Sequence, residues 1–424
     1  MPPPFIQRLK NISLLASLVA IPLSTHAQSW QFKGEGRFFS APTLAGNSIL
    51  AGSSAGHLYA IDVQSGQQRW KFSAGKEIAT QPCIAGNTAV VGSYDGNYYG
   101  VNIKNGLAVW TFKTGGERKN GGKGLWSMQP ATDYMEDPYD FFLSAPATDG
   151  KSVFFGSSDS SIYALDAATG NLRWKFRTSA PVHGGAAYSN NTVVIGSWDT
   201  YVYALDAKTG QLKWKFKTGT DTLYGGVLEG IQARPAIAGG RVFVGARDAK
   251  FRAIDLATGK LIWTYDGGNA WISGTAEIDG DHVYVGTSDS YLLLKLDAET
   301  GKEIFRNKGG GYIFGAPAVS KDLVAYGDFT GRMYLLNKDS LDVFRTFDTP
   351  GRKAHGTSLL DRDQIDFLFL AKGAIPEKYS TTLLVIDKLY ALGPITAAPL
   401  IAGNTVFVAS TDGTVYAIPL PNKR

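Results

Sequence analysis

The stretch YALDAATGNLRWKF, residues 163–176, recurs along the chain and decides the fold. Residues 203–216 repeat it as YALDAKTGQLKWKF, weaker copies end at 70–72, 110–112 and 263–265, and degenerate copies follow up to residue 347. The Asp or Asn of the motif stands at positions 62, 102, 166, 206, 255, 297 and 337. The basic period is therefore near 40 residues, with insertions in some links. Such a period is typical of four-stranded units and not of helical hairpins.

Each unit divides into four short strands. In the unit around the quoted stretch, we expect strands at 144–147, 152–156, 161–165 and 171–176. The last of them alternates Leu172, Trp174 and Phe176 with basic residues, a period of two that indicates a half-buried strand. Gly and Asp separate the strands, as hairpin turns require. The sequence therefore predicts an all-β fold, a β-propeller of four-stranded blades.

The two ends of the chain predict how the ring closes. An eighth unit begins at Ala397 and stops after 414–418 without a fourth strand. Residues 30–33, WQFK, match the missing strand. Pairing these segments would remove an exposed sheet edge. We therefore expect a single eight-bladed propeller over residues 28–424, closed by an N-terminal strand that completes the last blade.

The composition excludes several classes of protein. The chain has 424 residues, 44% of them hydrophobic, which rules out a mostly disordered chain. Its net charge of +5 is spread along the sequence and gives no reason to expect nucleic-acid binding. Cys83 is the only cysteine and cannot form an intramolecular disulfide. No stretch after the N-terminal segment is apolar enough to cross a membrane.

Residues 1–27 have the pattern of a secretory signal peptide. Arg8 and Lys10 precede an apolar run from Ile12 to Leu23, and Ala27 ends a small-residue cleavage site. The alternative, an uncleaved membrane anchor, would need a longer apolar run of ~20 residues. No cysteine near the cleavage site could carry a lipid. We therefore expect a periplasmic protein that is secreted and not lipidated.

The repeat resembles a known family. The pattern Ala-x-Asp-x-x-x-Gly-x-x-x-Trp, seen in full at residues 60–70, 164–174, 204–214 and 253–263, is similar to the tryptophan-docking motif of the pyrroloquinoline-quinone (PQQ) propeller repeat. The resemblance implies the fold but not the function. That superfamily holds quinoprotein alcohol dehydrogenases and also non-catalytic propellers such as the outer-membrane assembly factor BamB. The structural, inter-blade docking tryptophans are expected to be Trp30, Trp70, Trp110, Trp174, Trp214 and Trp263.

Two insertions depart from the repeat, at about 117–140 and 351–393. Both connect a fourth strand to the next first strand, so both should lie on one face, as functional loops or as a cap over the channel. We expect ligand-binding residues at this mouth of the channel: Arg37, Glu77, Trp126, His183, Glu229, Arg234, Trp271, Tyr312 and His355.

Arg234 is the sharpest of these candidates. Most units carry Ala-Pro before the first strand, whereas this unit has Ala233-Arg234-Pro235. Its cation could dock a small anion near the axis, or it could form an ion pair with a neighbour such as Glu229. His183 is a candidate base, although the sequence shows no carboxylate partner for it.

The sequence favours a non-catalytic binding or scaffold protein of the cell envelope. Its partner would be another envelope protein, in outer-membrane protein assembly, or a small ligand at the channel mouth. The alternative is an enzyme of the PQQ-dependent dehydrogenase type. Such an enzyme needs Ca²⁺ held by oxygen ligands and a stacking platform for the quinone. The dehydrogenases also typically carry adjacent cysteines, which this chain lacks. We therefore expect no catalytic residues, no metal and no cofactor.

Overall fold

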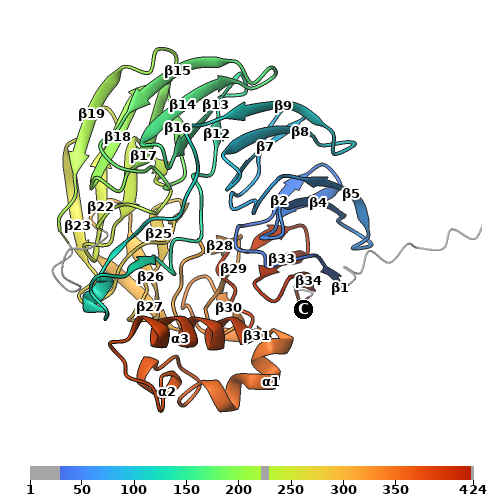
Figure 1. Cartoon of the computed structure of the whole chain (residues 1–424), viewed down its shortest axis with the longest axis vertical. Coiled ribbons are helices and arrows are strands. Elements are labelled where there is room, and N and C mark those ends of the chain that lie inside the picture. Colours follow the sequence, from blue (N-terminus) through green and yellow to red (C-terminus); the bar gives the residue numbers. More distant parts are fainter. Residues whose placement is uncertain (1–28, 221–228, 422–424) are drawn as a thin grey trace, which may run out of the picture.

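The computed structural model describes residues 29–220 and 229–421 and shows eight four-stranded sheets in a ring (Figure 1). The sequence prediction of an eight-bladed β-propeller is confirmed. In seven of these sheets four successive strands follow one another in antiparallel hairpins from the inside of the ring to the outside, and in the eighth the outer strand is β1 from the N-terminal end. The predicted signal peptide lies outside the described residues.

The strands of blades 1 to 4 are β2 (Thr43–Ala45), β3 (Ser48–Gly52), β4 (His57–Asp62) and β5 (Gln68–Ser73); β6 (Cys83–Ala85), β7 (Thr88–Ser93), β8 (Asn97–Asn102) and β9 (Ala108–Lys113); β12 (Ala147–Thr148), β13 (Ser152–Ser157), β14 (Ser161–Asp166) and β15 (Leu172–Arg177); and β16 (Ala187–Ser189), β17 (Thr192–Gly196), β18 (Tyr201–Asp206) and β19 (Leu212–Lys217).

The strands of blades 5 to 8 are β20 (Ala236–Ala238), β21 (Arg241–Gly245), β22 (Lys250–Asp255) and β23 (Leu261–Asp266); β24 (Glu277–Asp279), β25 (His282–Gly286), β26 (Leu292–Asp297) and β27 (Glu303–Lys308); β28 (Ala318–Val319), β29 (Leu323–Gly327), β30 (Arg332–Asn337) and β31 (Val343–Asp348); and β32 (Leu400–Ala402), β33 (Thr405–Ser410) and β34 (Thr414–Pro419) with β1 (Trp30–Lys33).

The N-terminal strand closes the ring as the sequence predicts. Strand β1 pairs antiparallel with β34, with Trp30 opposite Ala417 and Lys33 opposite Thr414. The first and last described segments of the chain therefore share blade 8 (Figure 1).

The indole of each motif tryptophan joins its own blade to the next one. The indole N–H of Trp174 donates to the carbonyl of Ala207 at 2.9 Å. The ring lies against Gly210, which has a φ of +72° and no Cβ that would collide with the indole. A buried indole needs a partner for its N–H, and this geometry supplies both the partner and an apolar contact. The other five indoles donate in the same way, from Trp30 to Val63, Trp70 to Ile103, Trp110 to Ala167, Trp214 to Leu256 and Trp263 to Ala298.

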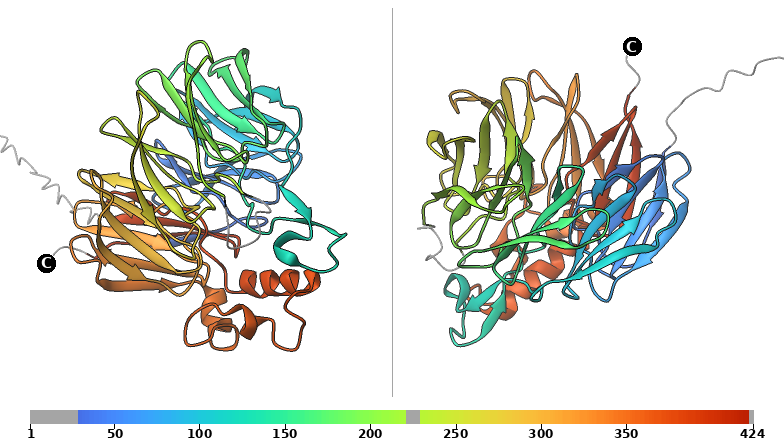
Figure 2. Two further views of the ribbon diagram at one scale, coloured as in Figure 1. Left: turned by 90° about the vertical axis from the view of Figure 1, so that its left-hand side faces the viewer. Right: turned by 90° about the horizontal axis from the view of Figure 1, so that it is seen from above.

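Both insertions depart from the four-stranded pattern. The first carries the hairpin β10 (Gly121–Lys123) and β11 (Tyr134–Glu136) and a short 3₁₀ helix, η1 (Leu125–Ser127). The second forms three helices, α1 (Pro350–Leu359), α2 (Phe367–Leu370) and α3 (Tyr379–Ala391). The sequence showed no convincing helical periodicity there, so these helices were missed. Figure 2 shows them gathered on one face of the ring. Within the described residues, no helix combines the length and hydrophobicity that crossing a membrane requires.

Candidate functional site

The two insertions meet and form a cap beside the mouth of the channel. The backbone N–H of Gln129 donates to the carbonyl of Glu377 at 2.7 Å, and that of Tyr379 donates back to Gln129 at 3.1 Å. These contacts join residues about 250 positions apart in the sequence. The expectation that both insertions lie on the same face is therefore confirmed. We call residues 114–146 and 349–399 together the cap.

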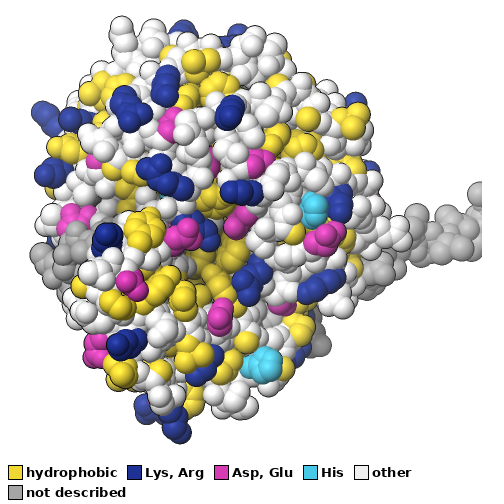
Figure 3. Space-filling view, viewed as in Figure 1, with side chains coloured by type: hydrophobic (Ala, Val, Ile, Leu, Met, Phe, Trp, Pro, Cys, Tyr) yellow, Lys and Arg dark blue, Asp and Glu magenta, His cyan; other side chains and the backbone are white. Residues whose placement is uncertain are grey.

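An aromatic core fixes the cap to the ring. Phe141 of the first insertion stacks on Phe39, with ring centroids 5.3 Å apart. Tyr312 and Phe314, which precede blade 7, pack in the same buried cluster together with Leu389 of α3. The cluster therefore connects blade 1, blade 7 and both insertions. Figure 3, drawn from the side seen in Figure 1, shows hydrophobic side chains around a hollow in the middle of this face, with charged side chains at its rim.

A buried ion pair holds the first insertion to blade 5. Asp137 and Arg247 form an ion pair at 2.5 Å, and both side chains are fully buried. The guanidinium lies between the rings of Trp198 and Trp271, 4.5 and 4.4 Å from their centroids. It also donates to the side-chain oxygen of Gln232 at 2.7 Å. A buried charge needs partners of this kind. Trp271 is buried because its ring packs on the guanidinium of Arg247.

His183 has a carboxylate partner that the sequence analysis did not identify. Its Nδ1 lies 2.8 Å from Asp140, and its Nε2 lies 2.7 Å from the hydroxyl of Ser158. The Ser158 hydroxyl donates to Glu117 at 2.9 Å, so Nε2 must donate to Ser158, and the ring is then protonated on both nitrogens. Burial alone would lower the pKa of His183, but the Asp140 carboxylate outweighs burial, and the pKa of His183 is raised.

Ser158, His183 and Asp140 lie at hydrogen-bonding distances like those of a nucleophilic triad, but they are not arranged to act as one. A nucleophilic serine needs a neutral imidazole to accept its proton and an open position for substrate. Here Ser158 is fully buried and donates to Glu117. The arrangement instead fixes both ends of the first insertion, through Glu117 and Asp140, to blades 3 and 4.

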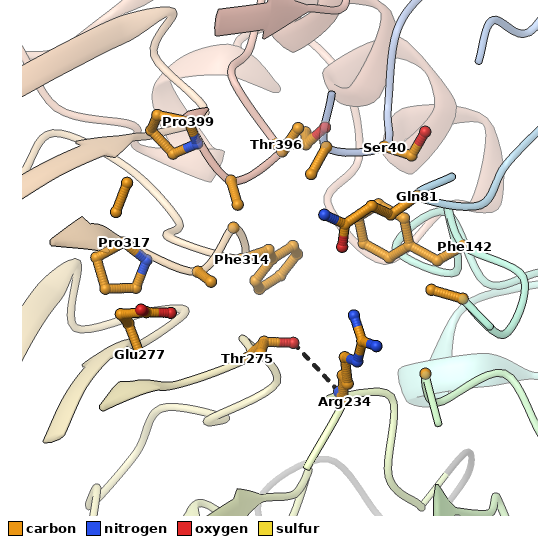
Figure 4. A pocket seen from close by; sticks show the side chains of 18 of the residues that line it. Ser40, Gln81, Phe142, Arg234, Thr275, Glu277, Phe314, Pro317, Thr396 and Pro399 are labelled. Atoms are coloured by element: carbon orange, nitrogen blue, oxygen red, sulfur yellow. Dashed lines mark hydrogen bonds between the residues drawn. The ribbon is translucent and has the colours of Figure 1, made fainter. Parts of the chain in front are cut away.

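The central channel contains a cavity of about 430 Å³. Eight equivalent positions, each two residues before the first strand of a blade, line it: Ala41, Gln81, Ala145, Gly185, Arg234, Thr275, Ala316 and Ala398. Five of these residues are Ala or Gly, which leaves the axis open. Arg234 is the charged member of this ring, and its side chain extends into the cavity (Figure 4).

Arg234 forms no ion pair with Glu229 in the structure, so that part of the sequence interpretation is wrong. Its Nε donates to the carbonyl of Ala186 at 2.8 Å, and one Nη donates to the carbonyl of Pro146 at 3.4 Å. These carbonyls satisfy two donors, and no carboxylate of residues 29–220 and 229–421 forms an ion pair with the guanidinium.

Within the described residues, the other predicted site residues do not line the channel cavity, although Trp271 and Tyr312 line a second pocket together. Arg37 stacks on Tyr390 of α3, 4.2 Å from the ring centroid. Glu77 is half-buried beneath the cap, and burial raises its pKa. Tyr312 belongs to the aromatic core, and His355 is exposed on α1. Glu229 is half-buried at the edge of the described residues, and the side chain of Trp126 lies outside them. Of the nine predicted residues, His183 and Arg234 line the channel cavity.

The described residues do not fit a Ca²⁺ ion beside a quinone. Within residues 29–220 and 229–421, no three His, Cys, Asp or Glu side chains converge as metal ligands. Two buried carboxylates of the first insertion, Asp137 and Asp140, already pair with Arg247 and His183. A hard cation requires several free oxygen ligands at one point.

Solved structures show the same fold at low sequence identity. BamB from Moraxella catarrhalis is 18% identical, with a TM-score of 0.66, over 93% of this chain and 100% of that chain. A computationally designed protein, Ika8, is 18% identical, with a TM-score of 0.65, over 92% and 99%. A europium-containing methanol dehydrogenase is 13% identical, with a TM-score of 0.60, over 76% and 80%.

The family comparison covers most of the sequence. No curated protein matches the chain in sequence. The family described as outer membrane protein assembly factor BamB matches residues 16–120, 116–266 and 252–369. The matched segments include seven of the eight blades and part of the cap. With its six docked indoles and closed eight-bladed ring, the chain belongs to this family of PQQ-like β-propellers.

Proposed function

We propose that the protein is a non-catalytic scaffold of the cell envelope that takes part in outer-membrane protein assembly by binding another envelope protein. Family membership supports this role. The observation that carries it in this chain is the exposed apolar surface of the cap. Large hydrophobic side chains are exposed at five positions of the second insertion: Leu368, Phe369, Ile375, Leu383 and Leu384.

These side chains are not required for packing the cap. The inner side of α3 already supplies Val385, Ile386 and Leu389 to the aromatic core. Leu368 remains 66% exposed and Ile375 59% exposed. A surface with several large exposed apolar side chains is a candidate protein-binding site. The polar groups Glu117, Asp140 and His183, in contrast, hold the first insertion to blades 3 and 4.

The secreted, periplasmic location and the absence of a cofactor belong to the same proposal. A scaffold in the periplasm needs the segment 1–27 only for export. Addition of PQQ and Ca²⁺ to the purified protein, followed by absorbance and thermal unfolding, tests the enzyme alternative. A tightly bound chromophore would overturn the scaffold role.

The direct test is complementation of a deletion strain of the source organism. The double variant Leu368→Lys, Leu383→Lys should fold normally but fail to restore the amount of outer-membrane proteins. The matched control is Leu107→Lys, because Leu107 is equally exposed at 66% and lies on blade 2 outside the cap. Full complementation by the cap variant, or unchanged outer-membrane proteins in the deletion strain, would contradict the proposal. Equal unfolding temperatures of the purified variants establish that the effect is on binding.

A further inference from the structure

The ring of eight equivalent positions around the channel cavity carries one charged residue, Arg234. The other positions hold five Ala or Gly residues and two neutral polar residues, Gln81 and Thr275. We propose that this cavity binds a small molecule with one carboxylate and an apolar body, and that the carboxylate contacts the guanidinium of Arg234. This inference is independent of the scaffold role, which uses the outer surface of the cap.

The neighbouring blade makes room for the Arg234 side chain. Gly185 occupies the same ring position in blade 4, and a Cβ there would lie only 3.0 Å from Cβ and 3.1 Å from Cγ of Arg234. The carbonyl of Ala186, one residue further, holds Nε at 2.8 Å. Together they direct the free end of the guanidinium toward the axis, as Figure 4 shows. The arginine is therefore positioned by its surroundings.

The guanidinium has donors left for a ligand. Its hydrogen bonds to described residues use Nε and one Nη, both toward backbone carbonyls, and Nη1 donates to none of these residues. Burial lowers the pKa of Arg234, but a guanidinium stays charged at neutral pH. The titratable group that acts on Arg234 is the Cys83 thiol, which is neutral at pH 7 because burial raises the pKa of Cys83 to about 11. A carboxylate ligand would place a negative charge against the guanidinium and can bind an arginine through two hydrogen bonds.

The walls of the cavity select the rest of the ligand. Phe142, Phe314, Pro317 and Pro399 lie around the space in front of the guanidinium (Figure 4). The volume of about 430 Å³ lies in the range of small-molecule sites. An apolar group of the size of a benzene ring fits this lining better than a hydrated inorganic ion. Glu277, the first residue of β24 and two residues after Thr275, also lines the cavity. Its carboxylate disfavours a second negative charge on the ligand.

Benzoate is the probe for this site, with benzamide as its neutral counterpart and acetate as the carboxylate without an apolar body. Calorimetric titration of the full mature chain should give measurable binding of benzoate and at least about tenfold weaker binding of benzamide and of acetate. Arg234→Gln should weaken benzoate binding about tenfold or more. The matched control is Arg177→Gln, which removes an exposed arginine that donates to the carbonyl of Asp159 in its own blade.

Two further variants keep the test decisive if Arg234→Gln does not fold. Arg234→Lys retains the charge and should lose a few-fold in affinity for benzoate. Glu277→Gln removes the other charge of the cavity and should tighten benzoate binding two- to threefold. The proposal is wrong if benzoate shows no binding at 10 mM, a probe concentration set on the order of a weak Kd. It is equally wrong if benzamide binds as tightly as benzoate, or if both Arg234 variants retain the native affinity.

Discussion

Two arcs of the ring are built differently. From blade 8 through blade 1 to blade 6, each of six successive interfaces has an indole that donates to a carbonyl of the next blade. At the interfaces of blade 7 with blades 6 and 8, Phe305 and Arg345 stand at the tryptophan position of the register. Phe305 is 44% exposed, and Arg345 donates to the carbonyl of Pro419. The helical insertion follows blade 7.

The residue of the next blade that faces the indole also differs between the two arcs. Six blades carry a glycine with positive φ there, whereas blade 7 carries Leu341 with a φ of +56°. Leu341 is buried and fills the space that an indole would otherwise use. The six interfaces from blade 8 to blade 6 thus all use the same pair of residues, a tryptophan and a glycine. The two interfaces of blade 7 use side chains that differ from one interface to the other. This difference shows that the motif stabilises blade docking and that docking can also be achieved without it.

The largest expected effect is the loss of an indole. Trp174→Ala should lower the free energy of unfolding by about 4 kcal/mol, because it removes a buried ring and its hydrogen bond. Phe305→Ala, at the same register position in the other arc, should cost less than about 1 kcal/mol because the residue is already 44% exposed. Denaturant unfolding of both variants measures the difference. Equal losses would mean that the two arcs do not differ in how their blades are held.

The cap should depend on the protonated His183. His183→Gln leaves the buried Asp140 without its cation and should cost about 3 kcal/mol at pH 6. Because the folded-state pKa of His183 is raised above 6.5, its contribution is fully present below pH 6.5 and is lost as the pH rises through the raised value. The difference in unfolding temperature between wild type and variant should therefore narrow at alkaline pH. His355→Gln, an exposed histidine of the cap, is the control, and a constant difference across pH would contradict the interpretation.

The glycine that faces the indole should matter for two separable reasons. At Gly210 a Cβ would lie 2.7 Å from Cδ2 of Trp174, and φ is +72°. Gly403 has a φ of +57°, and a Cβ there would meet nothing within 4 Å. Gly403→Ala should cost about 1 kcal/mol for the backbone alone, and Gly210→Ala at least about 2 kcal/mol. If thermal unfolding gives the same loss for both, the indole contact contributes nothing beyond the backbone term.

The smallest effect concerns the motif aspartate. Hydrogen bonds from Arg173 and from the Thr169 side chain and backbone lower the pKa of Asp166 to about 2, although burial partly opposes them. Its contribution to stability is therefore present above about pH 4 and is lost as the pH falls toward 2. Asp166→Asn should lower the free energy of unfolding by less than about 1 kcal/mol at neutral pH. Below about pH 4 the free energy of unfolding of the variant should depend less on pH than that of the wild type. Asn337 holds the same position in blade 7, so Asn337→Ser provides a control without acid dependence.

The sequence predicted the ring because its determinants are local and repeated. A tryptophan, an aspartate and a glycine at fixed spacing specify a strand, a turn and a docking contact within one unit. The closing strand could be recognised because residues 30–33 match the fourth strand that the last unit lacks. Arg234 could be placed near the axis because it interrupts the Ala-Pro pattern of its neighbours.

The contacts of the cap could not be predicted in this way. His183 and Asp140 are 43 positions apart, and Arg247 and Asp137 are 110 apart, with no repeat to relate them. The three helices are short and pack on both the ring and one another, so their apolar residues do not follow one clear stripe. Glu229 was offered as an ion-pair partner of Arg234 from its position in the sequence, whereas the guanidinium donates to the carbonyls of Ala186 and Pro146 in the described part of the chain.

The pairing of β1 with β34 has a consequence for synthesis and quality control. Lys33 is among the first described residues, and its strand partner Thr414 is among the last. The chain is synthesised from its N-terminus to its C-terminus. Strand β1 therefore cannot pair with β34 until nearly the whole sequence has been made. A polypeptide that ends before Thr414 therefore has an unfinished sheet with open hydrogen-bonding edges at the junction, and proteases or chaperones can distinguish it from a finished molecule.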